Sequence, residues 1–487
     1  MKNTKESKFT VLPVKASPAS QIKRVLPESE CNVKKCENRI NVGIFFDGTN
    51  NNLDEDSPSR SHTNIARLYG AYYSNEKLGS HRIYVPGVGT KFSDIGENER
   101  SSLGAGCAFG CEGRVIFGLL EILNFLHRQC YSENLFDKSA VLALCRNGSY
   151  VNLKIDKENL AKLGEDSGLL EPEMGDGNRR DFLTRQCKLL KEKLKTGKPR
   201  IVECFIDVFG FSRGAAEARV FCSWLNELLV GECLAGVPLR FRFVGIVDTV
   251  ASAGFWSGVI AFATKSTGGH GAWASAEALR LPSSVKNCVH MVAMHELRRN
   301  FPLDLIGIDG KVQQGWLQFA YPGSHSDVGG GYRPGELGIA VGDDSQKLSQ
   351  IPLNHMLECA VAAGAPITKS RPADGEYDPF AIHPDLAKAY EEFIDQATLN
   401  PRPVYEWLQP YLNWRWQIRD RFHTTSQVVR AGEMDRRVLL SHNKTLVDDA
   451  NIMGRMNKHR SFGQMAQAAM KTIIMSRKIR FVEIEIA

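Results

Sequence analysis

The sequence predicts an α/β fold with a mostly parallel sheet, helical insertions and a mainly helical C-terminal region. Two observations lead to this fold class. Apolar, β-branched segments of strand length alternate with helical segments, which is typical of parallel strands joined by helices that cover both faces of a sheet. Several strand segments also end in loops rich in glycine and polar residues, as strands do at the functional edge of such sheets.

The elements can be assigned from the period of their apolar residues. Strands are expected over 41–46, 81–85, 201–208, 240–247, 287–293 and 315–321. The clearest helices before residue 332 are expected over 113–127, 182–196 and 215–229.

The length and the polar segments suggest how the chain is divided. The chain has 487 residues, and at about 150 residues per domain this predicts two to three domains or one large domain with insertions. We expect a flexible basic N-terminal arm over 1–38, because this segment has no helix or strand period. The α/β domain is expected over 39–335, and the helical C-terminal region over 336–487 could be a lid or a membrane- or partner-binding part.

Composition excludes several classes of protein. The net charge of +6 is mild for this length and does not form the concentrated basic face of a nucleic-acid-binding protein. The 12 cysteines are scattered and lack zinc-site spacing, so we expect a reducing compartment, no metal and no cofactor. The N-terminus has no apolar signal segment, so we expect a protein made in the cytoplasm, with any export independent of a cleaved signal.

Residues 210–214 match the pattern G-x-S-x-G, with Ser212 at its centre. In this pattern the serine lies on a strained turn from a strand to a helix, and side chains two residues away on either side would collide. The pattern alone is weakly specific, but here an apolar strand precedes it and a helix that begins with small residues follows it. Ser212 is therefore the candidate nucleophile of a serine hydrolase.

A serine nucleophile needs a base and an acid that orients the base. Asp248 follows the next strand along the chain and His325 follows a later one, within a glycine-rich loop. The order Ser, Asp, His is that of α/β-hydrolases, so we predict Ser212, Asp248 and His325 as a catalytic triad on an α/β-hydrolase-like domain. The main rivals are His290 and His295 for the base and Asp327 for the acid. A core role for His290 and a capping role for Asp327 are the simpler interpretations of those two.

The oxyanion hole of such an enzyme needs two N–H donors. We predict Arg213, the residue after the nucleophile, as one donor and Gly48 or Thr49 as the other. The segment around Gly48 reads DGT, which also occurs in the D-x-D-G-T motif of aspartyl phosphatases. The nucleophile position of that motif is occupied by Phe45, so the phosphatase chemistry lacks its nucleophile.

Four ordered segments within roughly 41–335 resemble the lipase effectors of bacterial type VI secretion systems, the first phospholipase family among them. These segments are GIFFDGTNNN, GFSRGAA, VDTVAS and YPGSHSDVGGGY. The resemblance assigns the nucleophile to Ser212, the acid to Asp248 and the base to His325. One segment departs from the family, because MHELRRNF has His295 where the family has an Asp.

The resemblance implies an antibacterial toxin that hydrolyses acyl esters of membrane phospholipids at the A1 or A2 position. It also implies delivery on a secretion spike protein into the periplasm or membrane of a target cell, and neutralisation in the producer by an immunity protein. Phe255 and Trp256 lie in a short apolar, aromatic segment that could contact lipid or belong to the core. The alternatives are a soluble carboxylesterase or peptidase with the same triad, and a non-catalytic binding protein on a hydrolase scaffold.

Overall fold

A computed structural model gives the architecture of most of the chain. It describes residues 11–27, 36–100, 110–146, 153–166, 168–169, 178–251, 274–275, 277–296, 303–307, 312–369, 377–396 and 404–456.

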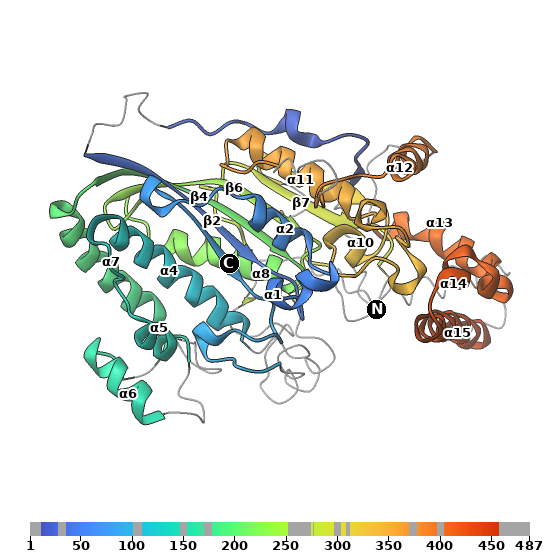
Figure 1. The fold of residues 1–487 in the computed structure, drawn as a ribbon, viewed down its shortest axis with the longest axis horizontal. Coiled ribbons are helices and arrows are strands. Elements are labelled where there is room, and N and C mark those ends of the chain that lie inside the picture. The colour runs from blue at the N-terminus through green and yellow to red at the C-terminus, as the bar shows by residue number, and fades with distance from the viewer. Residues whose placement is uncertain are drawn as a thin grey trace.

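An eight-stranded, mostly parallel sheet forms the centre of the molecule (Figure 1). Seven strands follow the order β1-β8-β7-β6-β4-β2-β3 with every pair parallel, and the short β5 pairs antiparallel with β6. The strands are β1 (Leu12–Pro13), β2 (Glu37–Phe46), β3 (Ser80–Val85), β4 (Arg200–Phe211), β5 (Cys233–Leu234), β6 (Val237–Val247), β7 (Cys288–Ala293) and β8 (Trp316–Tyr321). The predicted parallel sheet and its six predicted strands are confirmed.

Helices cover both faces of the sheet, so the central strands are apolar on both sides. On one face α4 (Cys111–Tyr131), α7 (Arg179–Thr196) and α8 (Arg213–Glu227) bury the larger core. On the other face α2 (Asn64–Ala71) and α11 (Gln350–Ala363) pack against the strands. The other α-helices that the structure describes before α11 are α1 (Leu53–Asp56), α5 (Lys138–Leu144), α6 (Leu153–Lys162) and α10 (His325–Gly329).

The N-terminal segment differs from its expected flexibility. Residues 11–27 are ordered, and β1 adds to the edge of the sheet by pairing with β8. Lys23 exchanges two hydrogen bonds with the side chain of Asn287, of 3.1 and 2.9 Å. The expectation of a flexible arm is therefore corrected for residues 11–27, because the backbone groups of this segment find partners that lie far away in the sequence.

The described part of the C-terminal region is mainly helical, but its first helix belongs to the α/β layers. α11 contributes Leu353 and Met356 to the core on one face of the sheet. The later helices extend from one end of the molecule (Figure 1) and are α12 (Pro384–Gln396), α13 (Val404–Gln417), α14 (Ser426–Arg430) and α15 (Glu433–Met456). Among the described helices, none combines the length and apolar character needed to cross a bilayer.

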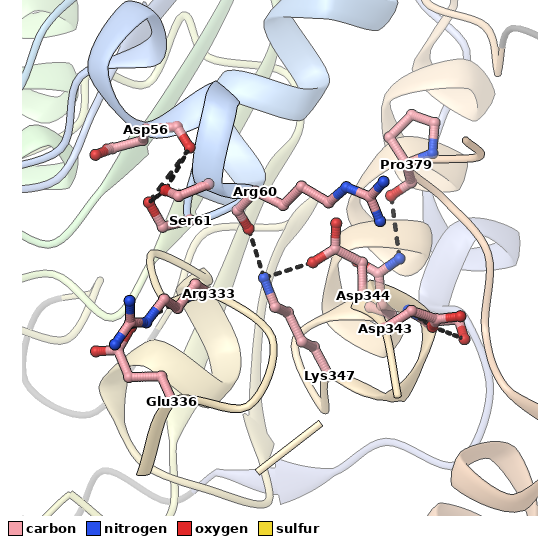
Figure 2. A network of polar contacts seen from close by, with 12 residues as sticks. Asp56, Arg60, Ser61, Arg333, Glu336, Asp343, Asp344, Lys347 and Pro379 are labelled. Atoms are coloured by element: carbon pink, nitrogen blue, oxygen red, sulfur yellow. Dashed lines mark hydrogen bonds and ion pairs between the residues drawn. The ribbon is translucent and has the colours of Figure 1, made fainter. Parts of the chain in front are cut away.

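A buried charge cluster joins α2, through Arg67, to the segment that precedes α11. Figure 2 shows two of its members, Asp344 and Lys347, beside the carbonyl of Arg60. Asp344 pairs with Arg67 at 3.3 Å and with Lys347 at 2.6 Å, and all three side chains are 2% exposed. Lys347 also donates to the carbonyl of Arg60 at 2.7 Å. Burial by itself raises the pKa of Asp344, but the two cations outweigh burial and hold that pKa below its ordinary value.

We expect Asp344→Asn to lower the free energy of unfolding by about 3–5 kcal/mol, because it leaves two buried cations without their carboxylate. The folded-state pKa is depressed, so the stabilisation is present above the unfolded-state pKa and is lost as the pH falls through the folded-state pKa. Urea unfolding between pH 7 and pH 3 measures both effects, with Asp385→Asn at a 91% exposed side chain as the control. Equal stability of Asp344→Asn and wild type at pH 7 would contradict the role of the cluster.

Candidate active site

Ser212 lies on a tight turn between β4 and α8. Its backbone has φ 59° and ψ −123°, a conformation that residues other than glycine rarely adopt. A Cβ on Gly210 would lie 2.4 Å from the carbonyl oxygen of Gly214. A Cβ on Gly214 would lie 2.3 Å from the carbonyl oxygen of Phe46. Both flanking positions therefore require glycine, for the steric reason that the sequence pattern suggests.

Backbone hydrogen bonds join this turn to the end of β6. The Ser212 N–H donates to the carbonyl of Val247 at 3.0 Å, and the Val250 N–H donates to the carbonyl of Ser212 at 3.1 Å. Asp248 lies between these two contacts and also has a positive φ, of 40°. The strand order thus brings the ends of β4 and β6 together, as expected for adjacent parallel strands.

Asp248 and His325 are hydrogen-bonded at the same edge of the sheet. His325 Nδ1 lies 2.7 Å from Asp248 Oδ2, and both side chains are at most 5% exposed. The other carboxylate oxygen, Oδ1, accepts the N–H of Ala293 at 3.0 Å. With Nδ1–H donated to the carboxylate, the lone pair of the neutral imidazole is on Nε2. The ring of His325 also packs on Phe211, the residue before Ser212, with centroids 4.5 Å apart.

The rival residues have other partners. His290 is buried in β7, where Nδ1 lies 3.0 Å from Gln318 Oε1 and Nε2 accepts the N–H of Thr249 at 3.3 Å. Burial lowers the pKa of His290 to about 4, so its ring is neutral at physiological pH. Asp327 caps α10 by accepting the N–H and the hydroxyl of Ser324 at 2.9 and 2.8 Å. His295 Nδ1 accepts the N–H of Gly323 at 3.0 Å.

The segment after β2 contains Gly48 and Thr49, the two residues predicted as donors beside Arg213. The Gly48 N–H donates to Asp47 Oδ1 at 2.7 Å, so it is already engaged. Of the two residues predicted as donors here, Thr49 is the one that remains a candidate. Arg213 is the first residue of α8, a position at which the N–H has no acceptor within its own helix.

Two acidic residues that brace the site were not identified from the sequence. Glu296 is buried, and its Oε2 accepts the N–H of His325 at 3.0 Å. Asp47 accepts the hydroxyls of Thr63 and Tyr84, each at 2.6 Å, in addition to the Gly48 N–H. Burial raises the pKa of Asp47 to about 6, and these three donors oppose that rise. In the sequence, Glu296 lies within MHELRRNF and Asp47 lies within DGT. These two segments stand out and are the signals from which the two acids could have been identified.

Other predictions from the sequence can be placed as well. Phe45 is fully buried and stacks on Phe209 with centroids 4.7 Å apart, so it belongs to the core. Phe255 and Trp256 lie outside the described residues. Within the described part of the chain, no group of three or more His, Cys, Asp or Glu residues is arranged to hold a metal ion.

A buried carboxyl group lies in the helix that follows Ser212. Glu217 is in α8 and is fully buried, near the thiol of Cys111 at the start of α4. Burial raises the pKa of Glu217 to about 8, although the positive charges of Arg114 and Arg213 oppose the rise. Glu217 is therefore mostly protonated at neutral pH and adds little negative charge to this buried region.

Comparisons with known proteins point to one family. Residues 41–231 and 234–359 match the family described as "T6SS, Phospholipase effector Tle1-like, catalytic domain". A solved structure titled "Crystal structure of an uncharacterized protein from Pseudomonas aeruginosa" is 28% identical, with a TM-score of 0.67, and the match covers 90% of this chain and 62% of that chain. This chain thus spans less than two thirds of that protein.

A second solved structure is titled "Structure of the Tle1 effector bound to the VgrG spike from the Type 6 secretion system". It is 21% identical, with a TM-score of 0.31, and the match covers 65% of this chain and 57% of that chain. The search of curated proteins finds no match.

We expect Glu217→Gln to stabilise the protein increasingly as the pH rises from 5 to 8. The folded-state pKa is raised, so the wild-type protein binds more protons when it is folded than when it is unfolded. Its free energy of unfolding therefore falls by up to about 1.4 kcal/mol for each pH unit in this range. Glutamine has the same shape and cannot ionise. Urea unfolding of both proteins at several pH values measures the difference, with the exposed Glu433→Gln as the control. A difference that does not change with pH would contradict the raised pKa.

Proposed function

Because this chain belongs to the Tle1-like family of type VI secretion phospholipase effectors, we propose that it hydrolyses acyl ester bonds of membrane phospholipids as a phospholipase A1 or A2. Ser212 is the proposed nucleophile, with His325 as the base and Asp248 as the acid. The observation that carries this proposal is the 2.7 Å hydrogen bond between Asp248 and His325, beside a serine turn whose flanking positions admit only glycine.

The geometry supports a two-step acyl transfer. His325 Nε2 takes the proton of the Ser212 hydroxyl while Ser212 Oγ forms a bond to the acyl carbonyl carbon. The N–H groups of Arg213 and Thr49 stabilise the resulting oxyanion. Collapse of this intermediate breaks the ester bond, and the departing lysophospholipid oxygen receives the proton from His325. Water then releases the fatty acid from Ser212 by the same steps, and Asp248 stabilises the imidazolium formed in each.

The proposal includes the route by which the enzyme is delivered to its target cell. We infer that the chain is delivered by a type VI secretion system on a spike protein, and that an immunity protein protects the producer. The support is family membership. Killing of a competitor that persisted after loss of the secretion apparatus would contradict this route.

Ser212→Ala should abolish ester hydrolysis while the protein remains folded, because alanine removes only the hydroxyl that attacks the carbonyl carbon. Mass spectrometry of the products from a defined diacyl phospholipid measures the loss and, for the wild-type protein, identifies the bond that is cleaved. Ser441→Ala, at an exposed position in α15, is the matched control. Hydrolysis near the wild-type rate by Ser212→Ala would eliminate the serine mechanism, and wild-type action on short soluble esters alone would favour a soluble esterase.

Asp248→Asn should lower kcat by about four orders of magnitude, since the amide cannot stabilise the imidazolium or hold Nδ1 protonated. Steady-state kinetics on a short soluble ester measure this loss without a contribution from membrane binding. Asp327→Asn is the comparison, because Asp327 caps α10 and its carboxylate accepts from Ser324. If Asp327→Asn caused the large loss and Asp248→Asn did not, the assignment of the acid would be wrong.

A further inference from the structure

The position of Thr49 is determined by close contacts with the serine turn. The carbonyl oxygens of Phe46 and Asp47 lie 2.3 and 2.4 Å from where a Cβ on Gly214 would be. A Cβ on Gly48 would lie 2.5 Å from Cδ1 of Phe211. The backbone that leads into Thr49 therefore packs against residues on both sides of Ser212.

The segment around Thr49 is also tied to its other neighbours. The Asn50 N–H donates to the carbonyl of Val88 at 3.0 Å, and the Asn51 N–H donates to the carbonyl of Gly48 at 2.9 Å. A Cβ on Gly87 would lie 1.7 Å from the carbonyl oxygen of Gly48, so the loop after β3 supports this segment from behind. These contacts place Thr49 in a preorganised position before any substrate binds.

The hydroxyl group of Thr49 is an exception among its neighbours. Thr63 Oγ1 donates to Asp47 at 2.6 Å, and Thr90 Oγ1 donates to the carbonyl of Gly87 at 2.8 Å. Thr49 Oγ1 is shielded from solvent yet has no hydrogen-bond partner among the residues that the structure describes. The Thr49 N–H also makes no hydrogen bond within that part of the chain. A buried hydroxyl without a partner is costly, so native proteins rarely keep one unless a ligand completes it.

We propose that the Thr49 hydroxyl is a third donor to the oxyanion, beside the N–H groups of Thr49 and Arg213. This inference rests on the proposed function. When Ser212 Oγ bonds to the acyl carbon, the carbonyl π electrons move onto the oxygen, and the hydroxyl donates a hydrogen bond to that charge. The bond strengthens as the charge develops and weakens when the carbonyl forms again, so it favours the transition state over the bound ester. The β-branched side chain restricts χ1 and keeps the donor oriented.

The test compares Thr49→Val, which keeps the shape and loses the donor, with Thr49→Ser, which keeps the donor. With a short p-nitrophenyl ester, Thr49→Val should lower kcat by about 10²–10³-fold, as loss of one oxyanion donor does. KM should change by less than about threefold, because the ground-state ester gains little from this bond. Thr49→Ser should keep most of the activity, and the exposed Thr445→Val is the control for the substitution itself.

A trifluoromethyl ketone inhibitor gives a second readout that a merely structural role would not change. Its adduct with Ser212 places an oxyanion in the hole, so Thr49→Val should raise its Ki by about the same factor as it lowers kcat/KM. If Thr49→Val does not fold, Thr49→Ala also lacks the donor, adds no atoms and should show the same losses.

The outcomes separate this inference from the proposed function. Wild-type kcat in Thr49→Val, together with an inactive Ser212→Ala, would overturn the third donor and leave the serine mechanism intact. An active Ser212→Ala would overturn the proposed function itself. Equal losses in Thr49→Val and Thr49→Ser would show that the methyl group or the packing of Thr49 matters, and not its hydroxyl.

Discussion

The close approach of the chain after β2 to the turn at Ser212 is the constraint on which the rest of the site depends. Carbonyl groups of this segment occupy the space that a side chain at Gly214 would need, and the carbonyl of Gly48 lies where a Cβ of Gly87 would be. A side chain at Gly87 would displace the segment from the loop after β3, and a side chain at Gly214 would push it away from α8. The separation between Thr49 and Arg213 would then increase, and the two proposed N–H donors could no longer converge on one oxyanion.

Two strained residues lie at the adjacent ends of β4 and β6. Ser212 and Asp248 both have positive φ, which costs on the order of 1–3 kcal/mol for each residue other than glycine. The sheet stabilises both residues. Backbone hydrogen bonds through Val247 and Val250 join the two turns to each other, and the Asp248 N–H donates to the carbonyl of Met291 at 2.7 Å. The long parallel pairing of β4 with β6 holds the two turns in place. Two of the strained positions of the chain thus lie at the edge where the chemistry is proposed.

The sequence predicted the parts of this arrangement that follow from local patterns. In the sequence, buried strands appear as apolar runs, and glycine and polar residues mark their ends. The rule that parallel strands end at one edge was therefore enough to predict that Asp248 and His325 lie close together. The sequence did not predict β1, because its two residues are too few to show a strand period. It also did not predict the role of Glu296. Their partners, β8 and the N–H of His325, lie far away in the sequence, and only tertiary packing brings them close.

Buried carboxylates decide which donors remain available at this edge. Asp47 engages the Gly48 N–H, Glu296 engages the His325 N–H, and Asp248 engages the Ala293 N–H. Each of these carboxyl groups accepts at least one backbone N–H close to the proposed site. The same hydrogen bonds remove those N–H groups from competition for a substrate carbonyl. Thr49 is left as the residue whose donors have no acceptor among the described residues, so the acids that brace the loops also determine where an oxyanion would be bound.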